Sequence, residues 1–148
     1  PSREIRQLAW HQKIMLPSDA VTTSSLAHPA RVRIKRIDSL DAGDIIGDVG
    51  PATIKKFVQA IREAKIVVWN GPVGYWEVSE FRRGTRRIAQ ALASCKGYTV
   101  VGGGDTLSAI EGSVSVRSFS HVSTGGGAML EFLAGKKLPG IEVLKIKN

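Results

Sequence analysis

The 148-residue sequence contains 43% hydrophobic and 23% charged residues, an ordinary globular composition that argues against intrinsic disorder. Its length suits one domain with a buried core. No apolar run approaches the roughly 20 residues that span a bilayer, so we expect no transmembrane helix. The formal net charge of +8 and a pI near 10.0 favour anionic ligands such as nucleotides, phosphorylated metabolites or nucleic acid.

The basic residues gather in two short clusters, Arg31–Arg36 and Arg82–Arg87. Neither cluster has interleaved aromatic residues on which bases could stack, so we expect solvated surfaces there and no nucleic-acid partner. The single cysteine, Cys95, excludes an internal disulfide and points to a reducing compartment. The first residues lack the apolar segment of a signal peptide, and we therefore expect a soluble, cytoplasmic protein without a membrane partner.

The first part of the chain predicts few regular elements. Residues 3–10 look like the end of a helix, which indicates that something upstream is missing, and Lys13–Leu16 predict an apolar strand. The polar stretch that follows is typical of a loop, with a short edge strand near Ala20–Thr22. Alternating charged and branched residues at 31–37 predict a half-exposed strand.

An amphipathic helix comes next, since Ile54, Phe57, Val58 and Ile61 recur at helical spacing after Pro51. Strands and helices then alternate: strands at 65–70, 98–101 and 118–123, and helices at 79–95, 105–112 and 128–134. This order predicts an α/β fold, a three-layer, Rossmann-like parallel sheet with helices on both faces. The tail from residue 136 is expected to return along the surface.

Each of the three predicted parallel strands runs into a loop with glycine: "WNGPVG", "VGGGDT" and "VSTGGGA". The carboxyl ends of parallel strands share one edge, where ligands bind. Glycine lets backbone N–H groups approach a ligand, and a helix that begins there adds unpaired N–H groups and its dipole. We therefore predict one phosphate-binding edge built from three loops. The alternative for each triplet is a tight turn where a helix packs closely on a strand.

Asp105 follows the first glycine triplet. A carboxylate among phosphate-binding amides is repulsive unless a cation lies between them, and Mg²⁺ binds one or two carboxylates together with phosphate oxygens. Asp105 is therefore a candidate metal ligand, and the hydroxyl of Thr106 is a candidate phosphate contact. The alternative for Asp105 is a plain helix N-cap.

The first loop offers further candidates for nucleotide binding. Asn70 could contact phosphate, Glu77 could accept from ribose hydroxyls, and Pro72 and Val73 could form one wall of a base pocket. Each has a structural alternative, because Asn-Gly-Pro is also simply a turn. The three histidines lack metal-ligand spacing, and neither a Walker motif nor a G-x-G-x-x-G motif after the first strand is present.

Three motifs follow one another in the chain: "VVWNGPVGYWE", "TVVGGGDT" and "SHVSTGGGAMLEFLAGKKLPGIEVL". With the upstream "KIMLPSDAV" and "DVGPATIKKF", they resemble the C-terminal domain of the phosphoglycerate kinase family. The resemblance covers nearly the whole chain. It implies a monomeric glycolytic enzyme that transfers a phosphoryl group reversibly between 1,3-bisphosphoglycerate and Mg-ADP, giving 3-phosphoglycerate and Mg-ATP.

The resemblance also implies a role for each candidate residue. Asp105 would hold the Mg²⁺ of ADP or ATP, and Thr106 would bind a phosphate beside Gly103 and Gly104. The transferring phosphoryl group would be bound by Gly125, Gly126 and Gly127. Asn70 would lie near the phosphates, and Glu77 would bind the ribose. The adenine would be bordered by Gly71, Pro72 and Val73. Tyr75, Trp76 and Met129 depart from the family's usual residues, but none removes a polar site residue.

Residues 1–148 are expected to form only part of the nucleotide-binding domain. The family's N-terminal domain, which binds the phosphoglycerate, and the first part of the nucleotide domain have no counterpart in the sequence. We expect the chain alone to be inactive, because no second domain can close on the nucleotide. Two other readings stay open: a non-catalytic module of the same fold that binds nucleotide or a partner, and a nucleic-acid binder suggested by the charge.

Overall fold

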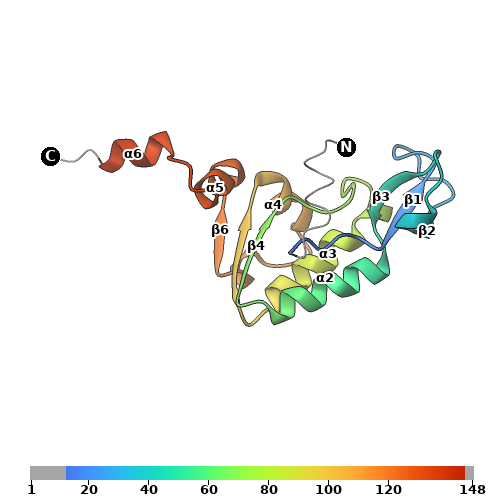
Figure 1. The fold of residues 1–148 in the computed structure, drawn as a ribbon, viewed down its shortest axis with the longest axis horizontal. Helices are drawn as coiled ribbons and strands as arrows, with labels where there is room; N and C mark the ends of the chain where they lie inside the picture. The colour runs from blue at the N-terminus through green and yellow to red at the C-terminus, as the bar shows by residue number, and fades with distance from the viewer. Residues whose placement is uncertain (1–12, 146–148) are drawn as a thin grey trace.

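The computed structural model describes residues 13–145, which form two small sheets and their associated helices (Figure 1). The strands are β1 (Asp19–Thr23), β2 (Arg33–Arg36), β3 (Ile45–Val49), β4 (Ile66–Asn70), β5 (Tyr98–Gly102) and β6 (His121–Ser123). The α-helices are α2 (Pro51–Glu63), α3 (Arg83–Ala93), α4 (Gly104–Ile110), α5 (Gly126–Leu133) and α6 (Pro139–Lys145). Short 3-10 helices lie at Ile37–Ser39, Ser79–Phe81 and Val116–Ser118. None of the described helices is long and apolar enough to cross a membrane.

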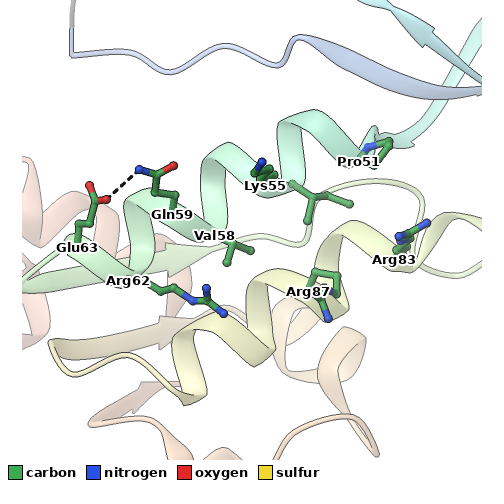
Figure 2. Close-up of a pocket in the computed structure, with 9 residues that line it drawn as sticks. Pro51, Lys55, Val58, Gln59, Arg62, Glu63, Arg83 and Arg87 are labelled. Carbon is green, nitrogen blue, oxygen red and sulfur yellow. Dashed lines mark hydrogen bonds between the residues drawn. The ribbon is translucent and has the colours of Figure 1, made fainter.

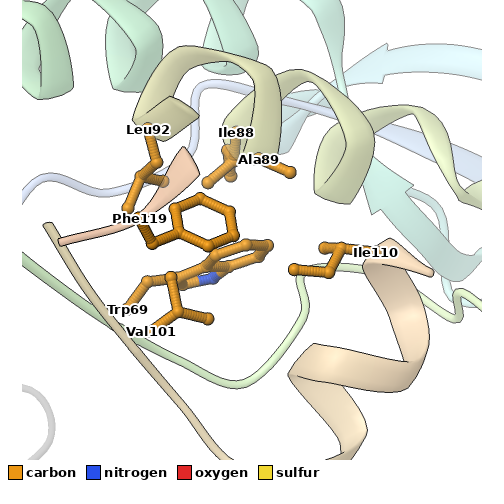
Figure 3. Packing of buried hydrophobic residues seen from close by; sticks show 7 residues of the cluster. All are labelled: Trp69, Ile88, Ala89, Leu92, Val101, Ile110 and Phe119. Atoms are coloured by element: carbon orange, nitrogen blue, oxygen red, sulfur yellow. The ribbon is translucent and has the colours of Figure 1, made fainter. Parts of the chain in front are cut away.

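Strands β4, β5 and β6 form a parallel sheet in that order, which confirms the predicted α/β fold. Trp69 of β4 and Val101 of β5 point to the same face of this sheet, because side chains alternate along a strand. There they pack with Ile88 and Leu92 of α3 and with Phe119 (Figure 3). Helix α2 packs beside α3. Ile88, Ala89 and Leu92 thus form the buried face of α3.

The second face of the parallel sheet is only partly covered. Helix α5 reaches it through Met129, which a Cβ added at Gly102 would meet. Ile66 and Val68 of β4 alternate with Trp69 and so point to this second face, where they are 68% and 39% exposed. Helices thus contact both faces as predicted, although β4 is exposed on its second face despite its apolar sequence.

The second sheet is antiparallel, with the order β2–β1–β3. Its central strand brings the buried Asp19 to the start of α2. The Asp19 carboxylate accepts hydrogen bonds from the backbone N–H groups of Ala52 at 2.9 Å and Thr53 at 2.7 Å, and from the Thr53 hydroxyl at 2.6 Å. Burial alone would raise the pKa of Asp19, but these hydrogen bonds outweigh it and lower the pKa below its ordinary value.

The predicted strand at Lys13–Leu16 is wrong. Residues 14–17 have no regular structure, and Ile14, Met15 and Leu16 are exposed. A strand needs a neighbour for its backbone N–H and C=O groups, and no described strand pairs with this segment. The predicted helix end at residues 3–10 lies outside the described residues.

Two other local predictions also need correction. The edge strand expected near Ala20–Thr22 is the centre of the antiparallel sheet, because β3 pairs with its free side. The tail does not return along the surface: it forms α6, which extends away from both sheets (Figure 1). Val143 and Leu144 of α6 are accordingly exposed.

Candidate functional site

The three strands of the parallel sheet end at the same level, and each runs into a glycine-bearing loop. Asn70 of β4 is paired with Gly102 of β5, which is paired in turn with Ser123 of β6. The N–H of Gly103 donates to the Ser123 carbonyl at 3.2 Å. The register of the strands therefore brings the three loops to one edge.

Asn70 connects these loops. Its Nδ2 donates to the carbonyl of Gly126 at 3.3 Å. Its Oδ1 lies so close to the other two loops that a Cβ added at Gly103 or Gly126 would be 2.7 or 2.8 Å from it. The side chain of Asn70 is therefore held within the protein, and it fixes how the loops approach one another.

Thr106 is completely buried and holds the first two loops together. Its Oγ1 accepts a hydrogen bond from the N–H of Gly71 at 2.8 Å. Gly71 itself has a φ of +93°, in the region that favours glycine. Thr106 thus positions the loop, and its predicted contact with a phosphate stays a prediction.

Two of the triplet glycines are required by packing. Gly103 adopts a φ of +93°. A Cβ at Gly126 would lie 2.7 Å from the Cα of Gly103, closer than real Cβ atoms approach their neighbours. At these two positions glycine is therefore explained by a tight turn and close packing, without any contact to a ligand.

Packing does not explain the other glycines of this edge. A Cβ at Gly104 or Gly127 would meet no atom within 4 Å, and one at Gly125 would meet only the Cβ of Ala128, at 3.8 Å. Gly104 begins α4, and Gly125 is the N-cap of α5. N–H groups in the first turn of a helix have no partner within it. The edge is therefore open and lined by donors that suit an anion.

Asp105 lies in the first turn of α4 and is exposed. It is not the plain N-cap, because Gly103 occupies that position. No ion pair of the described residues involves Asp105, and residues 13–145 hold no cluster of three or more His, Cys, Asp or Glu. A lone free carboxylate beside open N–H groups fits Mg²⁺ that takes its other ligands from phosphate and water.

The loop after Asn70 is held by hydrogen bonds from residues in α3 and directly before it. The Val73 carbonyl accepts from the Thr85 hydroxyl, and the Glu77 carbonyl accepts from Arg82 at 2.9 Å. Val73 also packs against the hydrophobic core, while Pro72 is half-buried. The Glu77 side chain is exposed, and no described hydrogen bond or ion pair joins it to the other candidate residues.

Asp48 is a buried carboxylate that the sequence reasoning did not single out. It is 1% exposed and accepts hydrogen bonds from the N–H groups of Gly84, in α3, and Val49, at 2.7 and 2.8 Å. Burial raises the pKa of Asp48 to about 6, although these hydrogen bonds and the charge of Arg83 oppose the shift. A Cβ at Gly74 would also meet Asp48. The available signal was an acid inside the apolar segment "IIGDVG".

The sequence is similar to known proteins over almost its whole length. The family model of phosphoglycerate kinase matches residues 3–136. The phosphoglycerate kinase of Dictyoglomus turgidum is 45% identical over 149 residues, which cover 99% of this chain and 38% of that relative. The phosphoglycerate kinase of Herpetosiphon aurantiacus is 46% identical over 135 residues, which cover 91% of this chain and 34% of that relative.

Solved structures of phosphoglycerate kinases share the fold. The structure from Coxiella burnetii has a TM-score of 0.84 at 40% sequence identity, over 95% of this chain and 36% of the other. The structure from Pyrococcus horikoshii OT3 has a TM-score of 0.81 at 31% sequence identity, over 97% of this chain and 35% of the other. The chain thus spans little more than a third of these relatives. The family match includes all three glycine loops and Asp105, and the chain belongs to the phosphoglycerate kinase family.

Proposed function

We propose that this chain forms the Mg-nucleotide half of a phosphoglycerate kinase. The complete enzyme would transfer a phosphoryl group reversibly between 1,3-bisphosphoglycerate and Mg-ADP, giving 3-phosphoglycerate and Mg-ATP. The observation that carries the proposal is the edge that the three loops share at Asn70, where the open Gly104 and Gly127 lie in the first turns of α4 and α5 and the free carboxylate of Asp105 follows Gly104. Phosphoryl transfer depends on positioning and on charge stabilisation, which backbone donors and a metal supply together.

Several residues of the edge have a proposed part in binding. Asp105 would hold Mg²⁺, which when bound neutralises charge on the nucleotide phosphates. The N–H groups at Gly125, Gly126 and Gly127 would bind the transferring phosphoryl group, since they begin α5. Gly71, Pro72 and Val73 would border adenine, and the exposed Glu77 would accept from the ribose hydroxyls.

The remaining steps of catalysis would fall to the part of the enzyme that this chain does not span. The chain covers 38% of the Dictyoglomus turgidum relative. We propose that the acceptor, 3-phosphoglycerate or 1,3-bisphosphoglycerate, binds to an N-terminal domain and that domain closure brings the two substrates together. A glycolytic role, a cytoplasmic location and a monomeric parent enzyme belong to the same proposal.

Calorimetric titration of the chain with ADP tests the proposed half-site. We expect binding that strengthens with Mg²⁺ and that Asp105→Ala weakens roughly tenfold or more, which corresponds to about 1.4 kcal/mol per tenfold change. Glu111→Ala is the matched control, because it removes one exposed carboxylate at the C-terminal end of the same helix.

Two results would contradict the proposal. Equal weakening by Asp105→Ala and Glu111→Ala would mean that Asp105 has no specific role, because a carboxylate at the other end of the helix would have the same effect. Absence of ADP binding with and without Mg²⁺ would mean that these loops do not form a working half-site in this chain, which leaves a non-catalytic module with the same fold.

A further inference from the structure

A groove of about 450 Å³ lies between helices α2 and α3. None of its lining residues belongs to the three glycine-bearing loops. Figure 2 shows the two helices side by side, with polar side chains from each lying along the groove. It is therefore a separate feature from the nucleotide edge.

Four cationic side chains line this groove. Lys55 and Arg62 come from α2, where they are two turns apart, and Arg83 and Arg87 come from α3, where they are one turn apart (Figure 2). Helical periodicity places residues at these spacings on one face of their helix. Each helix therefore contributes two positive charges to the same groove.

None of these four cations takes part in an ion pair of the described residues. Arg83 does interact electrostatically with the buried Asp48, since its charge acts to lower the pKa of that carboxyl group. Glu63 is the only carboxylate in the lining, and it accepts a hydrogen bond from Gln59 Nε2 at 3.0 Å. Arg87 donates a hydrogen bond to the side-chain amide oxygen of Gln90, at 3.4 Å. Like charges this close repel one another, and an anion in the groove would relieve that repulsion.

The shape of the groove indicates which anion fits. Its volume is in the range of small-molecule sites. It has no aromatic side chain on which a base could stack. Six of its nine lining residues are polar or charged, and the apolar Ile54 is only 6% exposed, so a peptide helix with an apolar face would have to desolvate several charged groups there. Guanidinium groups, which three of the four cations carry, bind phosphate oxygens in pairs.

We propose that the groove between α2 and α3 binds a compact, multiply phosphorylated small molecule through Lys55, Arg62, Arg83 and Arg87. This site is additional to the nucleotide edge, and binding of an anion there does not involve Asp105. Several phosphates are needed because the cations are distributed over two helices and along more than one helical turn.

Calorimetric titration of the chain with tripolyphosphate, with EDTA and in about 0.15 M salt, tests this proposal. The double variant Arg62→Gln/Arg87→Gln removes one cation from each side of the groove. Arg33→Gln/Arg117→Gln is the control, since it removes two exposed arginines elsewhere and changes the net charge equally. We expect the groove variant to bind roughly tenfold more weakly, and the control and Asp105→Ala to bind like the original chain.

Three outcomes would overturn the proposal. The first is equal weakening in the groove variant and in the control, which would indicate general charge attraction. The second is stronger binding by Asp105→Ala with no effect of the groove variant, because without a metal ion the Asp105 carboxylate repels phosphate; this would place the anion at the nucleotide edge. The third is groove-dependent binding of a DNA duplex or a polyglutamate peptide without binding of tripolyphosphate. Urea unfolding of each variant checks that the exposed substitutions leave the fold intact.

Discussion

Glycine residues serve two separate purposes at the edge of the parallel sheet. At Gly126 a side chain would collide with Gly103 and with Asn70. At Gly127, the next residue, a side chain would meet no atom within 4 Å. The triplet "GGG" in the sequence does not distinguish these cases, because both kinds of glycine stand side by side. Only the distances between the loops separate a glycine that packing requires from one that leaves space for a ligand.

Alanine substitutions at these two positions should therefore have opposite effects on stability. We expect Gly126→Ala to lower the free energy of unfolding by about 1–3 kcal/mol, because α5 must move away from Gly103. Gly127→Ala should leave stability unchanged or raise it by about 0.5–1 kcal/mol, since alanine is the better helix residue. Urea unfolding measures both changes.

The Gly127→Ala variant also tests whether the open edge binds nucleotide. Gly127→Ala should weaken Mg-ADP or Mg-ATP binding in calorimetry although the protein remains stable, because the added methyl group occupies the space in front of the α5 N–H groups. A stable Gly127→Ala variant with unchanged nucleotide affinity would contradict that use of the edge.

Helix α2 illustrates how an element depends on a distant residue. Its hydrophobic period and Pro51 predict the helix from local sequence, and the structure confirms it at Pro51–Glu63. Its N-cap residue, Gly50, makes no side-chain capping bond. The cap comes instead from Asp19 in β1, more than 30 positions earlier in the chain. The antiparallel sheet is therefore what holds the start of α2 in place.

Replacement of Asp19 should destabilise the protein through this helix. We expect Asp19→Ala to lower the free energy of unfolding by about 1–3 kcal/mol, because two backbone N–H groups of α2 lose their acceptor. Asp38→Ala, which breaks an exposed ion pair with Arg36, should have little effect. Equal unfolding midpoints in urea for both variants would contradict the capping role.

The pH dependence of the same variant has a defined sign. The pKa of Asp19 is lower in the folded state than its ordinary value of 3.8. The carboxylate therefore contributes stability that is fully present above the unfolded pKa and is lost as the pH falls through the folded pKa. The stability difference between the original chain and Asp19→Ala should shrink in that acidic range.

At the scale of the whole molecule, the described residues leave a large part of the parallel sheet uncovered. Ile66 and Val68 on β4 and Phe132 on α5 are exposed. The chain spans 38% of a relative with which it shares 45% identity. The proposed nucleotide edge lies among residues of this chain, whereas the sheet beside it is partly uncovered.

The chain alone should show no turnover with 1,3-bisphosphoglycerate and ADP. On the proposed function, turnover needs a second domain that closes on the nucleotide and positions the substrate that accepts or donates the phosphoryl group. A coupled assay of ATP formation measures this, with the complete kinase of Dictyoglomus turgidum as the positive control. Sustained ATP formation by the chain would refute the proposal that a second domain is needed for turnover, whether or not ADP binding is observed.

The sequence by itself determined the α/β alternation, the amphipathic helix α2 and the position of the three glycine loops, because these follow from residue periodicity and strand order along the chain. Tertiary structure decided the rest. It left Lys13–Leu16 without a partner strand and made β1 central, and it buried Asp48 and Thr106 as supports of the loops. It also joined α2 and α3 into one basic groove. Such features depend on contacts between residues far apart in sequence, which local patterns do not encode.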